Sequence, residues 1–153
     1  MNETVLTRKF ARFAAALKVG DFESIAEWLD PEFVVHEAAG LPYGGTYRGA
    51  EGWRELSRAV VTQYSDFRFE PLELIESVDG NLVVRFAISG RSCRSGKEFS
   101  TTVLEFWRFR NGLLAEILPH YWDTHLLAEL DDDQGRPAPP PPHDGSGAPR
   151  EDG

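Results

Sequence analysis

The chain has 153 residues, of which 41% are hydrophobic and 12% aromatic, so its composition suits one globular domain and argues against two. Acidic residues outnumber basic residues 25 to 16, and the formal charge of -9 argues against nucleic acid or an anionic membrane as a partner. The single cysteine, Cys93, excludes an internal disulfide, and no cysteine and histidine set has zinc-binding spacing, so neither a metal nor another cofactor is predicted.

Two features of the chain bear on its location and its domain boundary. No apolar run approaches the roughly 18 residues of a membrane-spanning helix, and residues 1–10 lack a signal-peptide pattern, so we expect a cytoplasmic protein. Residues 131–153 contain three consecutive aspartates, a proline run and scattered glycines, with almost nothing apolar to bury. This composition predicts a disordered acidic tail after a domain of residues 1–130.

The first part of the chain predicts helices. Apolar residues at helical spacing indicate a helix from Thr4 to a stop at Gly20. Asp21 is placed to cap a second helix of about nine residues, which Pro31 ends. A short β-type run and a loop rich in glycine and proline follow, and a third helix begins near Ala50.

The second part predicts antiparallel strands. Alternating apolar residues are separated by Asp79-Gly80 and Asn111-Gly112, which are typical of hairpin turns. The predicted strands cover residues 67–76, 82–91, 98–110 and 113–123. Helices followed by such a run of strands indicate an α+β domain in which helices cover one face of a curved sheet, and a sheet of this kind can enclose a pocket.

One acidic residue is predicted to face the interior of this sheet. Period-2 alternation places Glu105 on the same face as Val103 and Trp107. Burial among apolar groups raises the pKa of a carboxyl group, and the neutral acid then donates a hydrogen bond. The alternative is an edge-strand glutamate paired with Arg85 or Arg108, and alternation alone leaves both interpretations open.

Other polar candidates lie near the ends of strands. His36 and Glu37 are adjacent, so one of them points inward and the other outward. His36 and His120 can exchange protons near neutral pH, although a histidine in a strand is also often structural. Asp123 is either a third interior acid or the cap of a short terminal helix.

Aromatic residues surround the glycine-rich loop. Tyr43, Tyr47 and Trp53 predict either a rim for a flat organic ligand or a cover over the core. The loop lacks the Lys-Ser/Thr ending of a phosphate-binding loop. Motifs of serine hydrolases and zinc proteases are also missing from the sequence, so these enzyme classes have no support.

Four segments together resemble a known superfamily. They are Val-Gly-Asp-Phe-Glu-Ser-Ile at 19–25, Asp-Pro-Glu-Phe-Val-Val-His-Glu at 30–37, Tyr-Arg-Gly-Ala-Glu-Gly-Trp at 47–53 and Glu-Phe-Trp-Arg-Phe-Arg-Asn-Gly at 105–112. In these segments the chain is similar to the nuclear-transport-factor-2-like superfamily, which includes ketosteroid isomerases, SnoaL-type polyketide cyclases and limonene epoxide hydrolases. The resemblance spans roughly residues 4–130. It implies a cone-shaped, curved antiparallel sheet covered by three N-terminal helices, a cystatin-like α+β barrel, and a homodimer.

The resemblance also implies roles for individual residues. Glu37 falls where ketosteroid isomerases have their aspartate base, and Glu105 falls at the protonated aspartate of their oxyanion hole. Phe13 stands where those enzymes have the oxyanion-hole tyrosine, which argues against steroid isomerisation. Asp123 is similar in placement to the aspartate that removes a proton in SnoaL-type cyclases.

These inferences predict a cofactor-independent acid/base enzyme. It would be an isomerase or cyclase acting on a hydrophobic, carbonyl-bearing small molecule of specialised metabolism. Asp123 or Glu37 would be the base, and Glu105, helped by Tyr121 or His36, would hydrogen-bond the enolate. The predicted ligand contacts are Phe13, Tyr43, Tyr47, Trp53, Trp107, His120, Tyr121 and Trp122. Two alternatives stay open: a non-catalytic small-molecule-binding or dimerisation module, and water addition of the epoxide hydrolase or hydratase type.

Overall fold

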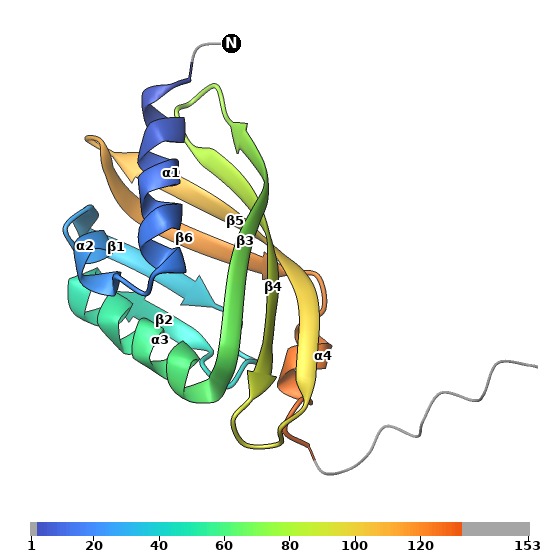
Figure 1. Cartoon of the computed structure of the whole chain (residues 1–153). Helices are drawn as coiled ribbons and strands as arrows, with labels where there is room; N and C mark the ends of the chain where they lie inside the picture. The colour runs from blue at the N-terminus through green and yellow to red at the C-terminus, as the bar shows by residue number, and fades with distance from the viewer. Residues whose placement is uncertain (1–2, 133–153) are drawn as a thin grey trace, which may run out of the picture.

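The computed structural model describes residues 3–132, and the predicted tail from residue 133 onward lies outside the described residues (Figure 1). Its first helix, α1 (Val5–Lys18), is capped by Thr4, whose side chain accepts a hydrogen bond from the Thr7 amide at 3.1 Å. Such a cap satisfies one of the free amide groups of the first turn. The predicted first helix is therefore confirmed.

The second helix is shorter than predicted. Asp21 caps α2 (Phe22–Ala26) as expected, by accepting a hydrogen bond from the Ser24 amide at 3.2 Å. The prediction of about nine residues is wrong because the first strand already begins at Leu29, which pairs with Leu114. Pro31 lies within this strand and does not terminate a helix. The third helix, α3, spans Gly49–Gln63 as predicted.

Six strands form one curved, unclosed sheet in the order β2-β1-β6-β5-β4-β3. Their bounds are β1 Leu29–Glu37, β2 Gly45–Arg48, β3 Tyr64–Glu76, β4 Leu82–Ser92, β5 Glu98–Arg110 and β6 Leu113–Tyr121. The sheet is mixed, because β1 and β6 are parallel and the other pairs are antiparallel. The expectation of an antiparallel sheet is therefore corrected for the pair β1 and β6. At this pair the first half of the chain, which holds the helices, joins the strands of the second half.

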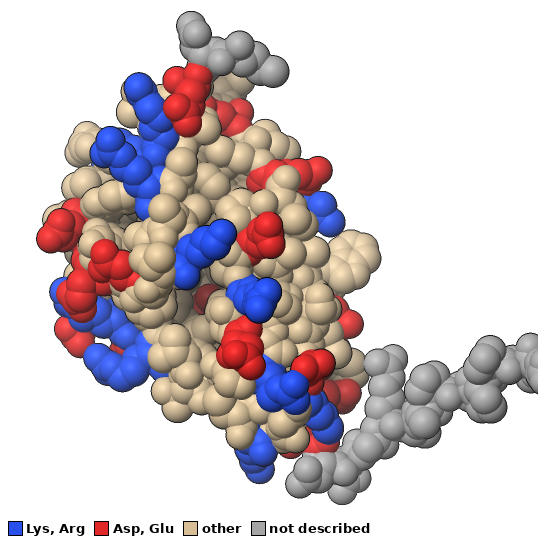
Figure 2. Space-filling model, viewed as in Figure 1, with Lys and Arg blue, Asp and Glu red and all other residues tan. Residues whose placement is uncertain are grey.

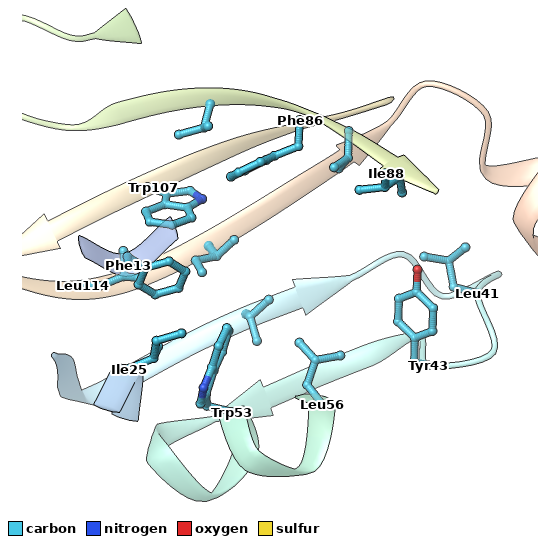
Figure 3. Packing of buried hydrophobic residues seen from close by; sticks show 14 of the residues in the cluster. Phe13, Ile25, Leu41, Tyr43, Trp53, Leu56, Phe86, Ile88, Trp107 and Leu114 are labelled. Atoms are coloured by element: carbon cyan, nitrogen blue, oxygen red, sulfur yellow. The ribbon is translucent and has the colours of Figure 1, made fainter. Parts of the chain in front are cut away.

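The helices α1, α2 and α3 cover the concave face of the sheet, and the core lies between the two layers (Figures 1 and 3). Phe33, Phe86 and Trp107 are fully buried there. Burial of such large apolar side chains supplies most of the stabilisation of a domain of this size. The α+β class and the covering helices are therefore as predicted.

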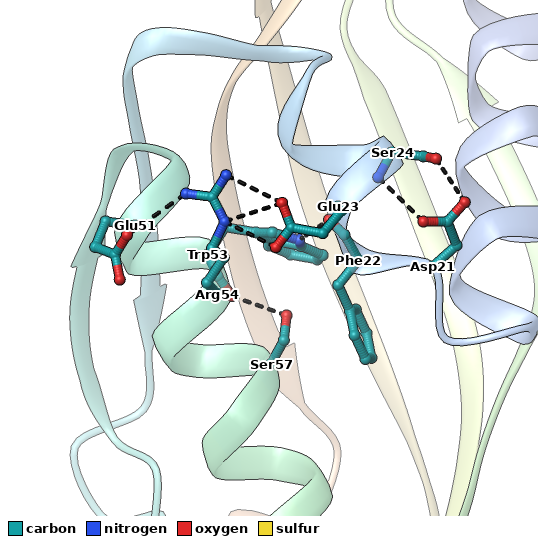
Figure 4. A network of polar contacts seen from close by, with 8 residues as sticks. All are labelled: Asp21, Phe22, Glu23, Ser24, Glu51, Trp53, Arg54 and Ser57. Atoms are coloured by element: carbon teal, nitrogen blue, oxygen red, sulfur yellow. Dashed lines mark hydrogen bonds and ion pairs between the residues drawn. The ribbon is translucent and has the colours of Figure 1, made fainter.

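A polar network fastens α2 to α3 (Figure 4). The Nε1 atom of Trp53 donates a hydrogen bond to the backbone carbonyl of Phe22 at 3.2 Å, and Nε of Arg54 donates to Glu23 at 2.9 Å. The exposed ion pair contributes little to stability. The indole hydrogen bond fixes the orientation of the Trp53 ring, which becomes one wall of the cavity described below.

Side-chain hydrogen bonds are present at the C-terminal end of the described region. Asp131, assigned to the tail from composition, accepts a hydrogen bond from Nε2 of Gln63 at 2.7 Å and another from the Ser92 hydroxyl. Within residues 3–132, no helix has both the length and the apolar content needed to span a bilayer.

The outer face of the sheet carries partly exposed apolar side chains. Leu104 is 36% exposed and Phe106 is 39% exposed. Apolar side chains on a sheet face are a common basis for subunit contacts. The homodimer stays a prediction.

Candidate active site

A cavity of about 660 Å³ lies between the sheet and the helices α1 and α3, within the usual size range of small-molecule sites. Figure 2 shows a hollow near the centre of one face of the molecule, with acidic and basic side chains on its edge. The wall of the cavity is mostly apolar and includes Phe13, Trp53 and Trp107. The cavity can therefore hold a hydrophobic molecule away from water.

The first acidic group in this cavity is Glu37, at the end of β1. His36 points to the opposite face, where its Nδ1 atom lies 3.2 Å from the Thr46 hydroxyl, so Glu37 is the inward-pointing member of the pair. The Tyr121 hydroxyl donates a hydrogen bond to Oε2 of Glu37 at 2.8 Å. Burial raises the pKa of Glu37 to about 7, and the bond from Tyr121 partly offsets this rise.

The second acidic group is Glu105, which is only 8% exposed. The indole of Trp107 donates a hydrogen bond to Oε2 of Glu105 at 2.6 Å. Burial raises the pKa of Glu105 to about 8, and the neighbouring charge of Glu37 adds to the rise.

The alternative interpretation of Glu105, as an edge-strand partner of an arginine, is wrong. Arg85 pairs with Glu73 at 3.6 Å, and Arg108 pairs with Glu116 at the same distance of 3.6 Å. Both arginines thus have partners elsewhere, which leaves Glu105 in the apolar interior.

A chain of tyrosine hydroxyls ends at Glu37. The Tyr43 hydroxyl donates to the Tyr121 hydroxyl at 3.3 Å, and Tyr121 in turn donates to Glu37. Burial raises the pKa of both tyrosines, so both stay protonated and act as donors. Figure 3 shows the Tyr43 hydroxyl directed toward the interior. Tyr47 contacts this chain only through the backbone, because its hydroxyl donates a hydrogen bond to the carbonyl oxygen of Tyr43 at 2.7 Å.

The two carboxyl groups are therefore held in different environments. Each carboxyl group accepts one side-chain hydrogen bond, Glu37 from the Tyr121 hydroxyl and Glu105 from the Trp107 indole, and burial raises the pKa of Glu105 further than that of Glu37. The higher pKa of Glu105 favours protonation of Glu105 before protonation of Glu37 as the pH falls. The cavity thus offers one base and one hydrogen-bond-donating acid near neutral pH.

Five residues expected at the site do not line the cavity: Asp123, Trp122, His120, His36 and Tyr47. Asp123 caps α4 (Thr124–Ala128) by accepting a hydrogen bond from the Leu126 amide at 2.9 Å, and it does not line the cavity. Trp122 is 86% exposed, and His120 packs against Phe106 on the outer face. The physical reason is that β6 ends at Tyr121, so the alternation that turns Tyr121 inward does not continue to Asp123.

The cavity also has lining residues that were not identified from the sequence. Phe67 and Phe69 on β3 line it, as do the charged residues Lys18 and Arg68. The alternation in β3 gives the inward positions of the two phenylalanines. The charged lining residues Lys18 and Arg68 lie on different elements, and no local pattern brings them to one cavity.

Comparison with protein families gives one match: residues 10–117 match the model of the SnoaL-like domain. Comparison with curated proteins finds no match. The family match covers most of the described region, including β1 with Glu37 and β5 with Glu105.

Solved structures share the fold. An NTF2-like protein of Burkholderia pseudomallei is 26% identical, with a TM-score of 0.70 over 78% of this chain and 91% of that one. TerC, co-crystallised with polyporic acid, is 26% identical, with a TM-score of 0.66 over 76% of this chain and 92% of its own. IdmH of Streptomyces antibioticus, a candidate polyketide cyclase, is 22% identical, with a TM-score of 0.65 over 83% of this chain and 99% of its own.

Proposed function

This chain belongs to the SnoaL-like domain family, and on that basis we propose that it is a cofactor-independent acid/base enzyme, an isomerase or cyclase, acting on a hydrophobic, carbonyl-bearing small molecule. The observation that carries the proposal is the placement of Glu37 and Glu105 in one apolar cavity with different hydrogen-bond donors. The candidate cyclase IdmH and the ligand-bound TerC, which share the fold, are consistent with a small-molecule substrate.

The proposed reaction begins with proton transfer. The carboxylate of Glu37 takes a proton from a carbon next to the substrate carbonyl, and the electron pair of that C–H bond moves to form an enolate. The neutral carboxyl group of Glu105 donates a hydrogen bond to the enolate oxygen. In an isomerase Glu37 returns the proton to a different carbon. In a cyclase the enolate carbon attacks a second carbonyl carbon, and the new alkoxide takes the proton from Glu37.

The apolar wall makes these groups more effective. The ring of Phe13 meets Trp107 edge-on with centroids 4.5 Å apart, and it meets Trp53 in the same manner at 5.7 Å. These rings exclude water from one side of the cavity. Hydrogen bonds to a developing charge are stronger where water is excluded, because the local dielectric constant is lower.

The proposal is tested by hydrogen exchange on a simple hydrophobic ketone. 2-Tetralone, a two-ring ketone with exchangeable protons next to its carbonyl, is incubated with the protein in deuterated buffer and followed by proton NMR. We expect deuterium to enter these positions faster than with acetate of the same carboxylate concentration. Binding of 2-tetralone without faster exchange would contradict the enzyme and favour the non-catalytic binding module.

Tyr121→Phe provides a prediction about the base. In the native chain the hydrogen bond from Tyr121 favours the ionised form of Glu37. Loss of this bond should therefore raise the pKa of Glu37 above its present value of about 7. The acid limb of the exchange rate should move to higher pH, with a loss of less than about tenfold at alkaline pH, where Glu37 is ionised. Tyr47→Phe, which removes a hydroxyl that bonds only the Tyr43 backbone, is the matched control. An acid limb that stays in place in Tyr121→Phe contradicts this role.

A further inference from the structure

We propose that Lys18 and Arg68 form an anion-binding rim at the mouth of the cavity, so that the substrate carries an acidic group at the end opposite its reacting carbonyl. This inference rests on the proposed function, because it concerns the substrate of the same site. It adds a substrate class: amphipathic molecules with an apolar body and one anionic end.

The two cations lie on different elements that border one cavity, and Arg68 alternates with Phe67 and Phe69 along β3, an edge strand of the sheet. Lys18 is in the last turn of α1, and Arg68 is on β3. Both line the cavity, and both side chains are exposed to solvent. Within residues 3–132, neither side chain forms an ion pair or a side-chain hydrogen bond, so both can bind a ligand without breaking an existing contact.

The charges around the cavity are unevenly distributed. Its exposed charged residues are Lys18, Arg68 and the single acid Glu70, whereas Glu37 is half-buried and Glu105 is buried. The mouth therefore carries a net positive charge although the whole chain carries -9. A charge at the mouth of an apolar cleft attracts ions of the opposite sign and raises their local concentration.

This distribution also orients an amphipathic ligand. Apart from its few charged and hydroxyl-bearing residues, the cavity wall is apolar and includes Leu56, Val60, Phe67 and Phe69. An anionic group would be desolvated in that region and repelled by ionised Glu37. At the mouth it keeps contact with water and with two cations. The apolar, carbonyl-bearing end then enters first and reaches the buried carboxyl groups.

A matched pair of fluorescent probes tests the rim without any knowledge of the true substrate. 1-Anilinonaphthalene-8-sulfonate carries a sulfonate, and N-phenyl-1-naphthylamine is the same molecule without it. We expect Lys18→Gln and Arg68→Gln each to weaken binding of the sulfonate probe by about 3- to 10-fold and to leave binding of the neutral probe unchanged. Increasing the salt concentration to about 0.5 M should weaken only the sulfonate probe.

The control variant is Arg8→Gln, which removes one positive charge from the same helix at a residue that does not line the cavity. It should leave both affinities unchanged. The two probes should also displace each other, since they share the cavity. The rim is contradicted if Lys18→Gln and Arg68→Gln change neither probe or change both equally, or if the sulfonate probe fails to displace the neutral one. None of these results involves Glu37 or proton transfer, so the rim can fail while 2-tetralone exchange still succeeds.

Discussion

Glu37→Gln is expected to lower the rate of 2-tetralone exchange by about 10²–10⁴-fold, which is the contribution of one positioned general base. The amide has nearly the shape of the carboxylate but does not accept a proton near neutral pH. Its oxygen can still accept the hydrogen bond from Tyr121 that Oε2 of Glu37 accepts at 2.8 Å. The loss should therefore appear in kcat, and the circular dichroism spectrum and the thermal unfolding midpoint should stay close to those of the native chain.

Asp123→Asn is the matched control for this variant. Asparagine caps helices as well as aspartate does, so α4 should keep its cap while the chain loses the acid once expected to be the base. The exchange rate should be unchanged. An inactive Asp123→Asn, or a fully active Glu37→Gln, would show that the base has been assigned to the wrong carboxylate.

The second large effect concerns Glu105. Glu105→Leu removes the donor that faces the enolate oxygen, and we expect the rate to fall by about 10²–10³-fold. Glu105→Gln keeps a donor in the form of its amide N–H and should retain most of the rate. The comparison between leucine and glutamine separates the loss of a hydrogen bond from the loss of a titrating group. Equal activity in Glu105→Leu and the native chain would rule out this role.

The pH dependence of the exchange rate also distinguishes Glu105→Gln from the native chain. Activity of the native chain should rise as Glu37 ionises near its pKa of about 7 and fall as Glu105 loses its proton near its pKa of about 8. Glutamine does not ionise, so the alkaline limb should disappear in Glu105→Gln. A limb that persists unchanged would have to come from another group.

The free energy of unfolding should also depend on pH because of Glu105. Burial raises the pKa of Glu105 from 4.5 to about 8, so between these pH values the folded state binds more protons than the unfolded state. The free energy of unfolding therefore decreases as pH rises through this range. Each pKa unit corresponds to about 1.4 kcal/mol, so Glu105 should lower the free energy of unfolding of the native chain by about 3–5 kcal/mol across this pH range. In Glu105→Gln this decrease should be missing when the free energy of unfolding is measured in urea at several pH values. Parallel curves for the variant and the native chain would contradict the burial.

Local sequence patterns predicted the first and third helices and the inward direction of one of the two site acids, but they overestimated the length of the second helix. The Asp21 cap acts within a few residues and is where the sequence places it, and the first helix starts next to Thr4 as predicted. Alternation within β5 turned Glu105 inward because it continues without a break from Val103 to Trp107. The short strand β2 was missed because its residues lie in a glycine-rich stretch with weak strand propensity.

Contacts between distant segments could not be predicted in this way. Tyr121 reaches Glu37 because β1 and β6 pair in parallel, with Val35 opposite Ile117, and no local pattern contains that register. Asp123 was ambiguous for a related reason, since the inward alternation of β6 holds only as far as Tyr121 and the point where a strand ends depends on its partners.

The most direct test is a carbon-13 NMR titration of the glutamate side-chain carboxyl groups in the native chain, with Glu37→Gln and Glu105→Gln used to assign the two signals. We predict that Glu37 titrates near pH 7 and Glu105 near pH 8, so that at neutral pH Glu37 is about half ionised while Glu105 is mostly protonated. Titration of both groups near their ordinary value of 4.5 would show two ionised carboxylates and would contradict an acid and a base held together in this cavity.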